Sequence, residues 1–146
     1  MDAEIIVHKR AKQPCYRVVG ESIRAIAESR HTRNTFSLFE VVTPPKSGAP
    51  VHKHSHVEAT YVLEGRLELV TGDERQLLEP GDFARVPGDT PHAFFNPGDT
   101  PARSLEFAMP GGVEAMFADI DATFGDAAPD PAALVELIQR YGVALG

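Results

Sequence analysis

The sequence predicts an all-β protein, an antiparallel sandwich or barrel, with two short helices after the last strand. Clusters of glycine, proline, aspartate and asparagine recur along the chain, and short apolar runs stand between them. Near residue 113 the spacing of apolar residues changes to a helical period. The length of 146 residues fits one domain, because domains usually have about 100–200 residues. A single domain over residues 1–146 is therefore expected.

The strand candidates are short runs bounded by turns. Leu67 and Leu69 alternate with Arg66 and Glu68, which is the period-two pattern of a strand with one buried face. Comparable runs cover residues 35–42, 59–63, 66–70, 75–78, 83–86, 92–95 and 102–108, with weaker candidates at 16–20 and 22–27. Strands at this spacing are typical of antiparallel sandwiches and barrels.

The C-terminal part of the chain has helical spacing. Asp130 and Pro131 form an N-cap and first-turn pair, and Gly142 ends the helix that they begin. Apolar residues recur at three- and four-residue intervals, with Val113, Met116, Phe117 and Ile120 in the first helix and Leu134, Leu137, Ile138 and Tyr141 in the second. We expect both helices to pack on the outside of the barrel or across its mouth, with the first stripe serving packing.

Composition argues against several classes of protein. The formal net charge is −7, whereas a nucleic-acid binder needs a basic face, so no nucleic-acid partner is expected. Cys15 is the only cysteine, which excludes an intramolecular disulfide and a zinc finger. No run approaches the ~20 apolar residues of a membrane span. The apolar run near the N-terminus is too short for a signal peptide, so we expect a cytoplasmic protein without a membrane partner.

Three histidines and a glutamate stand where the strand pattern is clearest. His52 and His54 occupy alternate positions, which places both imidazoles on one face of a strand, and Glu58 and His92 follow. Imidazole suits zinc, copper, iron and nickel, and a carboxylate adds harder ions such as manganese. A six-coordinate ion on these four ligands would keep open positions, as catalytic sites do. The alternative is a set of hydrogen-bonded polar residues in a barrel without a metal ion.

Two spacings in this region resemble the two motifs of the cupin superfamily. The first is His52-x-His54-x3-Glu58-x6-Gly65, and the second is Gly81-x5-Pro87-x-Asp89-x2-His92-x3-Asn96. The sequence departs from the family pattern at Lys46, where a glycine is usual, and at Asp89, which replaces an inner glycine of the second motif. Aspartate tolerates the left-handed backbone, so we expect the turn at Asp89 to form.

The sequence segments 36–45 and 61–65 are similar to those of small single-domain (monocupin) quercetinase-like proteins. The resemblance implies a double-stranded β-barrel of the jelly-roll type, with its core at about residues 35–108 and a helical tail at 112–146. It implies one divalent first-row transition metal ion, which is iron, nickel, manganese, cobalt, copper or zinc, held by His52, His54, Glu58 and His92. It also implies a homodimer, in which the apolar run Ile5-Ile6-Val7 would add a strand to the sheet of the second copy.

The function implied is that of a metal-dependent dioxygenase acting on a small enolic or aromatic substrate, quercetin-like or diketone-like. The metal ion would lower the pKa of a substrate hydroxyl, and Glu58 would take its proton as the general base. Two alternatives use the same ligands or the same fold. They are a non-redox, metal-dependent cyclase or isomerase of the polyketide type, and a non-enzymatic cupin that binds or senses a small ligand.

Four further residues are candidates for the substrate pocket. Thr60 shares the strand parity of the candidate glutamate, and Phe94 and Asn96 share that of the last candidate histidine. Core packing is the alternative for Thr60 and Phe94, and capping of the turn at 96–99 is the alternative for Asn96. His56 is a further ligand, a pocket base or a residue of the rim, because the alternation breaks in the segment around it.

Overall fold

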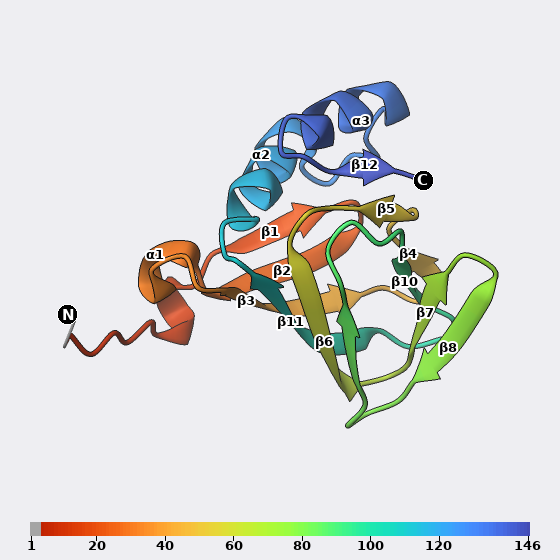
Figure 1. Ribbon diagram of the computed structural model, residues 1–146, viewed down its shortest axis with the longest axis horizontal. Coiled ribbons are helices and arrows are strands. Elements are labelled where there is room, and N and C mark those ends of the chain that lie inside the picture. The colour runs from red at the N-terminus through yellow and green to blue at the C-terminus, as the bar shows by residue number, and fades with distance from the viewer. Residues whose placement is uncertain (1–3) are drawn as a thin grey trace.

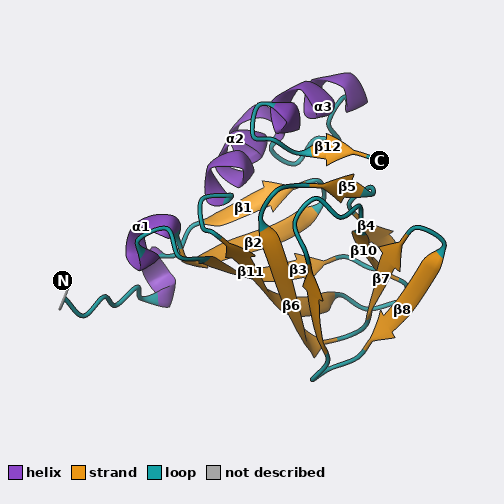
Figure 2. Ribbon diagram, in the orientation of Figure 1, coloured by secondary structure: helices purple, strands orange, loops and turns teal. Residues whose placement is uncertain are grey.

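The computed structural model describes residues 4–146, and these are mostly β-strands with helices at one end (Figures 1 and 2). In spatial order, the larger sheet contains β1 (Cys15–Val18), β2 (Glu21–Ala27), β3 (Ser37–Thr43), β11 (Ala102–Met109), β6 (Val57–Glu64) and β9 (Phe83–Val86). The smaller sheet contains β4 (Ser47–Gly48), β10 (Ala93–Asn96), β7 (Leu67–Thr71) and β8 (Glu74–Leu78). A separate two-stranded ladder pairs β12 (Ala144–Leu145) with β5 (His52–Lys53).

Both expected C-terminal helices are present, as α2 (Glu114–Phe124) and α3 (Pro131–Gln139). The side chain of Asp130 caps α3 by accepting a hydrogen bond from Ala133 N at 3.1 Å. The sequence did not predict the short helix α1 (Ser29–Thr32) or the 3₁₀ turn η1 (Arg10–Lys12). Among the described residues no helix is both long and apolar enough to cross a membrane.

The jelly-roll type of β fold is confirmed, but the ladders of residues 4–146 do not close into one continuous barrel. The larger sheet ends at β9 and the smaller sheet ends at β8, although these two strands follow one another in the chain. The turn that joins them contains Gly81 at a φ of 95°, a conformation that suits glycine. The two sheets nevertheless enclose one cavity, because side chains from β6 and β11 and from β7 and β10 line it together.

The inner face of the larger sheet is partly polar. On β3, four alternate side chains are buried, and Ser37 and Thr43 are the outer two of them. On β6, Glu58 and Thr60 are buried at alternate positions, and Ser104 is buried on β11 beside them. Antiparallel pairing brings Thr43, Glu58, Thr60 and Ser104 onto one wall of the cavity, whereas Ser37 hydrogen-bonds to Glu114. Polar groups at such positions are a departure from an ordinary apolar core.

The helices close one end of the two sheets (Figure 1). Met116, Phe117 and Ile120 of α2 pack with Leu137 and Ile138 of α3 in a buried apolar cluster. The same cluster includes Phe39 and Val41 of β3, so the helices are held by the larger sheet. This confirms the expected packing stripe of the first helix, although several of its residues also line the cavity.

Strand β5 lies between two partners. On one side, His52 N donates to His92 O and His92 N donates to His52 O, each at 3.0 Å. On the other side, β12 pairs with β5, with Leu145 opposite His52, and Gly146 N donates to Val51 O at 2.9 Å. The backbone at the first candidate ligand is therefore held both by the segment of His92 and by the C-terminal strand.

The two departures from the family pattern share one backbone conformation. Asp89 has a φ of 57° and Lys46 has a φ of 55°. Both values lie in the left-handed region, which glycine adopts most readily. The expected turn at Asp89 does form, and a lysine takes the equivalent conformation at the other position.

Candidate metal centre

The four predicted ligands come from three places in the chain and meet at one end of the cavity. His52 belongs to β5, and His54 follows it directly. Glu58 lies near the start of β6, and His92 precedes β10. Of these side chains, His54, Glu58 and His92 are buried and His52 is partly exposed.

The side-chain atoms of these residues lie close enough to share one ion. One ring nitrogen from each of His52, His54 and His92 lies within 4.8 Å of the other two. Glu58 adds its carboxylate, with Oε2 at 3.1 Å from His92 Nε2 and Oε1 at 3.8 Å from His54 Nε2. The structure thus brings His52, His54 and His92 together and places Glu58 beside His54 and His92, while His54, His56 and Glu58 form a second group of possible ligands.

Backbone carbonyl groups orient the three imidazole rings. The Nδ1 atoms of His52, His54 and His92 lie 2.9, 3.0 and 2.7 Å from the carbonyl oxygens of Pro50, His56 and Thr90, respectively. A carbonyl can only accept a hydrogen bond, so each Nδ1 carries the proton and each Nε2 of the uncharged ring is unprotonated. This is the arrangement in which histidine binds a metal through Nε2. The Nε2 atom of His92 also lies within hydrogen-bond distance of Glu58 Oε2, at 3.1 Å.

Burial favours the uncharged form of the imidazoles of His52, His54 and His56. It lowers the pKa of His52, and with the neighbouring histidines it lowers the pKa of His54 to about 3. The pKa of His56 falls to about 4 for the same reasons. An uncharged imidazole is the form that ligates a metal ion, so these rings are ready to bind at neutral pH.

The donor set fits a divalent transition metal ion. His54 Nε2 is buried and has no hydrogen-bond partner, which is costly for a polar atom unless a ligand completes its coordination. Three imidazoles and one carboxylate suit first-row divalent ions.

Glu58 also contacts a second carboxyl group. It is hydrogen-bonded to Glu106 of β11, and burial raises the pKa of both carboxyl groups above the usual range for glutamate. Two adjacent buried carboxyl groups cannot both ionise easily, so the pair holds a proton between them. A group that can exchange a proton with Glu58 therefore stands directly behind it.

The predicted pocket residues fall into two groups. His56, Thr60 and Phe94 line the cavity beside the candidate ligands. The ring of His56 is stacked on that of His54, with centroids 3.7 Å apart and planes 1° apart. Asn96 lies apart from them, since its Nδ2 donates to Thr43 O and Thr100 O and its Oδ1 accepts from Gly98 N. It serves the turn that follows β10 and does not line the cavity.

Two acidic residues of the cavity were not predicted, namely Glu21 and Glu106. Glu106 shares strand parity with Ser104 and Ala108 in an otherwise recognisable strand, and this parity could have indicated an inward carboxylate. Glu21 stands at the start of β2, where a turn and a weak strand signal gave no indication of its direction.

Comparisons with known proteins give the relatives of this chain. A family model described as "Cupin domain" matches residues 39–107. Quercetin 2,3-dioxygenase of Bacillus subtilis is 36% identical over 110 residues, which are 72% of this chain and 32% of that protein. The chain therefore spans about a third of the length of this relative.

Solved structures with this fold include two bacterial proteins. The polyketide cyclase RemF from Streptomyces resistomycificus has a TM-score of 0.64 at 24% identity, with 73% of this chain and 80% of that chain covered. A RmlC-like cupin from Shewanella frigidimarina has a TM-score of 0.65 at 15% identity, with 77% and 96% covered. At these identities the likeness concerns the fold alone. Together with the matched family model and the relative of higher identity, it shows that the chain belongs to the cupin superfamily.

Proposed function

We propose that the protein is a metal-dependent dioxygenase that acts on a small enolic or aromatic substrate. The observation that carries the proposal is the set of three imidazoles, each with its Nδ1 held by a backbone carbonyl group, next to the carboxylate of Glu58. The similarity to quercetin 2,3-dioxygenase supports the reaction class. The ion bound by His52, His54, Glu58 and His92 would supply Lewis acidity toward a substrate oxygen and, if redox-active, reactivity toward dioxygen.

The chain's own residues provide the remaining chemistry. Glu58 takes the proton of the substrate hydroxyl as a general base, and the proton that the pair already holds stays on Glu106. Phe94 and Leu67 line the cavity and exclude water from the reacting group. Apolar walls of this kind favour a flat aromatic or diketone-like molecule.

Elemental analysis of the purified protein beside His52→Ala tests the proposal. Lys53→Ala is the matched control, because Lys53 is the exposed neighbour of His52 on β5. We expect about one equivalent of iron, nickel, cobalt, manganese or copper in the wild type and in Lys53→Ala, and a loss of most of it in His52→Ala. Oxygen uptake with flat enolisable substrates should follow the metal content.

The same experiment separates the alternatives. Zinc alone at that stoichiometry, without oxygen uptake, contradicts a dioxygenase and leaves the non-redox cyclase or isomerase. Absence of metal from both proteins after reconstitution contradicts both enzymatic functions and leaves a binding protein.

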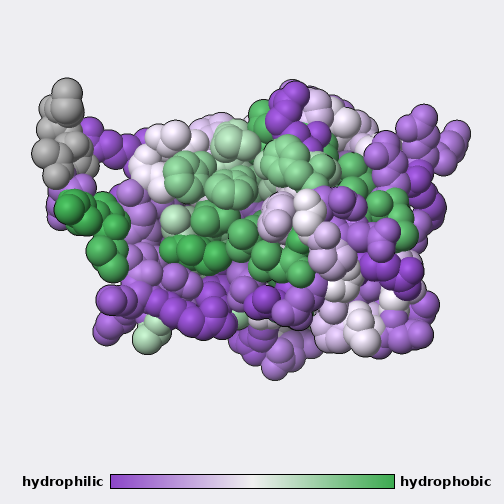
Figure 3. Space-filling view, turned by 90° about the horizontal axis from the view of Figure 1, so that it is seen from below, coloured by the Kyte–Doolittle hydropathy of each residue, from purple (hydrophilic) through white to green (hydrophobic). Residues whose placement is uncertain are grey.

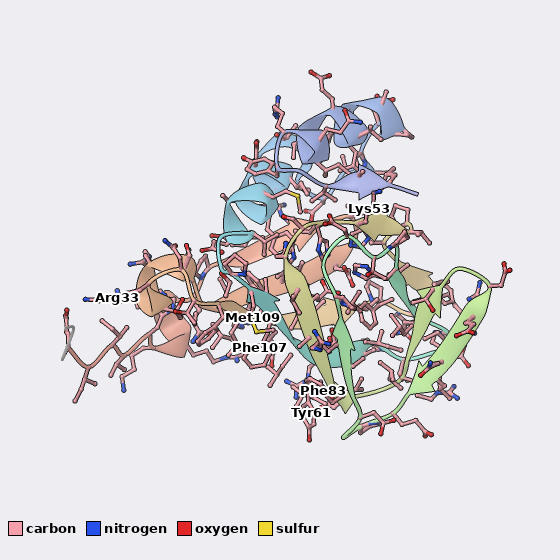
Figure 4. All side chains as sticks on the ribbon, in the orientation of Figure 1. Arg33, Lys53, Tyr61, Phe83, Phe107 and Met109 are labelled. Carbon is pink, nitrogen blue, oxygen red and sulfur yellow. The ribbon has the colours of Figure 1, made fainter. Side chains whose placement is uncertain are left out.

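We further propose that the protein forms a homodimer through the outer face of its larger sheet. On this face Tyr61 is 40% exposed and Phe83, its partner on β9, is 63% exposed. Figure 4 shows Tyr61 and Phe83 near Phe107 and Met109, and hydrophobic surface gathers on the side seen in Figure 3. A second copy is the occupant we favour, because residues 5–7 extend from the body with Ile5 87% exposed.

Gel filtration with light scattering, which gives the molar mass of the eluting protein, tests whether it is a dimer. Phe83→Lys should convert the dimer to a monomer, because it places a charge in the centre of the apolar face. Leu77→Lys is the control, since Leu77 is 47% exposed on the other sheet. A wild-type protein that elutes as a monomer contradicts the proposal.

A further inference from the structure

The cavity beside the candidate metal centre is small and lies between the two sheets and the C-terminal helices. Its volume is about 120 Å³. An apolar cavity of ~150 Å³ holds one benzene molecule. The buried part of a ligand in this cavity is therefore about one ring in size.

Three acidic side chains line the cavity, and the basic side chains beside them are histidines, which burial keeps from charging. Glu21, Glu58 and Glu106 line it, and among residues 4–146 no lysine or arginine does so. Thr43 Oγ1 donates a hydrogen bond to Glu21 Oε2 at 2.7 Å. A buried anion without a positive partner costs several kcal/mol. A second anion near these carboxyl groups would meet this penalty and their repulsion.

Hydroxyl groups on the same wall can bind an uncharged polar ligand. The Oγ1 atom of Thr60 is buried and has no hydrogen-bond partner. Ser104 of β11 also lines the cavity and is 3% exposed. The carboxyl and hydroxyl groups of the cavity can accept a hydrogen bond from a hydroxyl group of the ligand. An ionised carboxylate group of a ligand has no proton to donate to them.

The opposite side of the cavity is apolar. Leu67 and Phe94 line it from the smaller sheet, and Met116 and Ile138 line it from the helices. A ring with hydroxyl groups on one edge would match both walls, because its apolar face and its donors are on different sides.

We propose that this cavity selects an uncharged hydroxylated ring and rejects carboxylate and phosphate ligands. That a hydroxyl group of this ring reacts at the metal centre rests on the proposed function. The selection against negative charge rests on the side chains of the cavity. Glu21 is the residue whose effect can be measured separately, because it is not among the four candidate metal ligands.

Calorimetric titration with catechol and salicylate tests this selectivity. Both probes are single rings with two adjacent oxygen-bearing groups, and salicylate carries a carboxylate. The titrations use zinc-loaded and metal-free protein at pH 8. Neither form contains a redox-active ion, so the probes are not oxidised during the titration. Elemental analysis first establishes whether zinc is retained.

We expect the wild type to bind catechol at least about tenfold more tightly than salicylate in both forms. Glu21→Gln removes a negative charge at nearly constant volume and should reduce this ratio by roughly fivefold to tenfold. Glu136→Gln is the matched control, because it makes the same change at an exposed position of α3 that does not line the cavity. Its ratio should stay within about twofold of the wild type.

Three results overturn the inference: equal binding of the two probes, no binding of either, or a ratio that Glu21→Gln leaves unchanged. Failure to retain any first-row divalent ion after reconstitution contradicts the proposed function instead, and the metal-free titrations then decide the selectivity alone.

Discussion

At the scale of single residues, the candidate ligands are oriented by their own neighbours in the sequence. Each of the three carbonyl acceptors lies two residues from the histidine that it holds. The ring orientation therefore needs only the local backbone and forms with the strand ends themselves. Such preorganisation lowers the ordering cost of binding an ion.

Thr60 illustrates a conflict between stability and binding. Its buried Oγ1 lacks a partner, and an unsatisfied polar atom costs about 1–3 kcal/mol. We expect Thr60→Val to raise the free energy of unfolding by about 1 kcal/mol and to weaken the binding of catechol. Thr43→Val should lower stability instead, because its hydroxyl is hydrogen-bonded to Glu21. Urea denaturation measures both, and a loss of stability in Thr60→Val contradicts the prediction.

Glu21 should make stability depend on pH. Burial raises its pKa from 4.5 to about 7, so the folded protein holds this proton where the unfolded chain has lost it. Stability is then highest below about pH 4.5 and falls as pH rises to about 7. Glu21→Gln lacks this loss and should gain roughly 3 kcal/mol relative to the wild type between pH 4.5 and pH 8. Urea denaturation at several pH values measures the free energy of unfolding of both proteins. A difference between them that does not change from pH 4.5 to pH 8 would contradict the prediction.

The ligands could be predicted from the sequence because strand alternation and motif spacing are local properties. The contact between Glu58 and Glu106 could not, since it depends on the pairing of β6 with β11 across more than forty intervening residues. Spacing also leaves the role of Asn96 open, and only the hydrogen bonds assign it to the turn.

At the scale of elements, the strands from β6 to β11 lie where the alternating runs predict them, within a few residues. The short strands β4, β5 and β12 have two residues each and carry no periodic signal. They form because longer strands present partners to them. Helix α1 has four residues, and its Glu28 and His31 form a reciprocal capping box that ordinary capping patterns do not include.

Glu114 joins three elements at the start of α2. Its carboxylate accepts hydrogen bonds from Ser29 N of α1 at 2.6 Å, from Ser37 Oγ of β3 at 2.7 Å and from Gly112 N at 3.1 Å. Burial alone would raise the pKa of Glu114, but the hydrogen bonds from Ser29 and Ser37 lower it below its usual value of 4.5.

We expect Glu114→Gln to lower the free energy of unfolding by about 2 kcal/mol at pH 7. The stabilisation by Glu114 is present above pH 4.5 and is lost as pH falls through the lower pKa of the folded protein, so the two proteins should converge in acid. Glu136→Gln, on the exposed side of α3, is the control and should change little. Thermal unfolding at several pH values measures the difference.

At the scale of the whole molecule, the cavity depends on both sheets and on the C-terminal helices. The sequence predicts each layer separately, yet the space between them is set by tertiary packing. This is why the sequence indicates a packing role for Met116 and Phe117 but does not indicate that they also line the cavity.

The position of β5 couples the candidate metal centre to the C-terminal strand. An ion that fixes His52 should stabilise the pairing of β5 with β12, and by reciprocity the pairing should strengthen ion binding. We expect hydrogen exchange at the amide of Gly146, which donates to Val51 O, to slow by about tenfold on metal loading. Amides of β8 provide the control, and equal exchange with and without metal contradicts the coupling.

This arrangement also offers a practical sensor. A fluorescent dye joined after Gly146 would lie next to the strand of His52 without replacing any ligand. Its anisotropy would rise as the metal centre is filled, because the docked C-terminal strand restricts the dye's rotation. Occupancy could then be followed continuously in solution, even for ions that have no optical signal of their own.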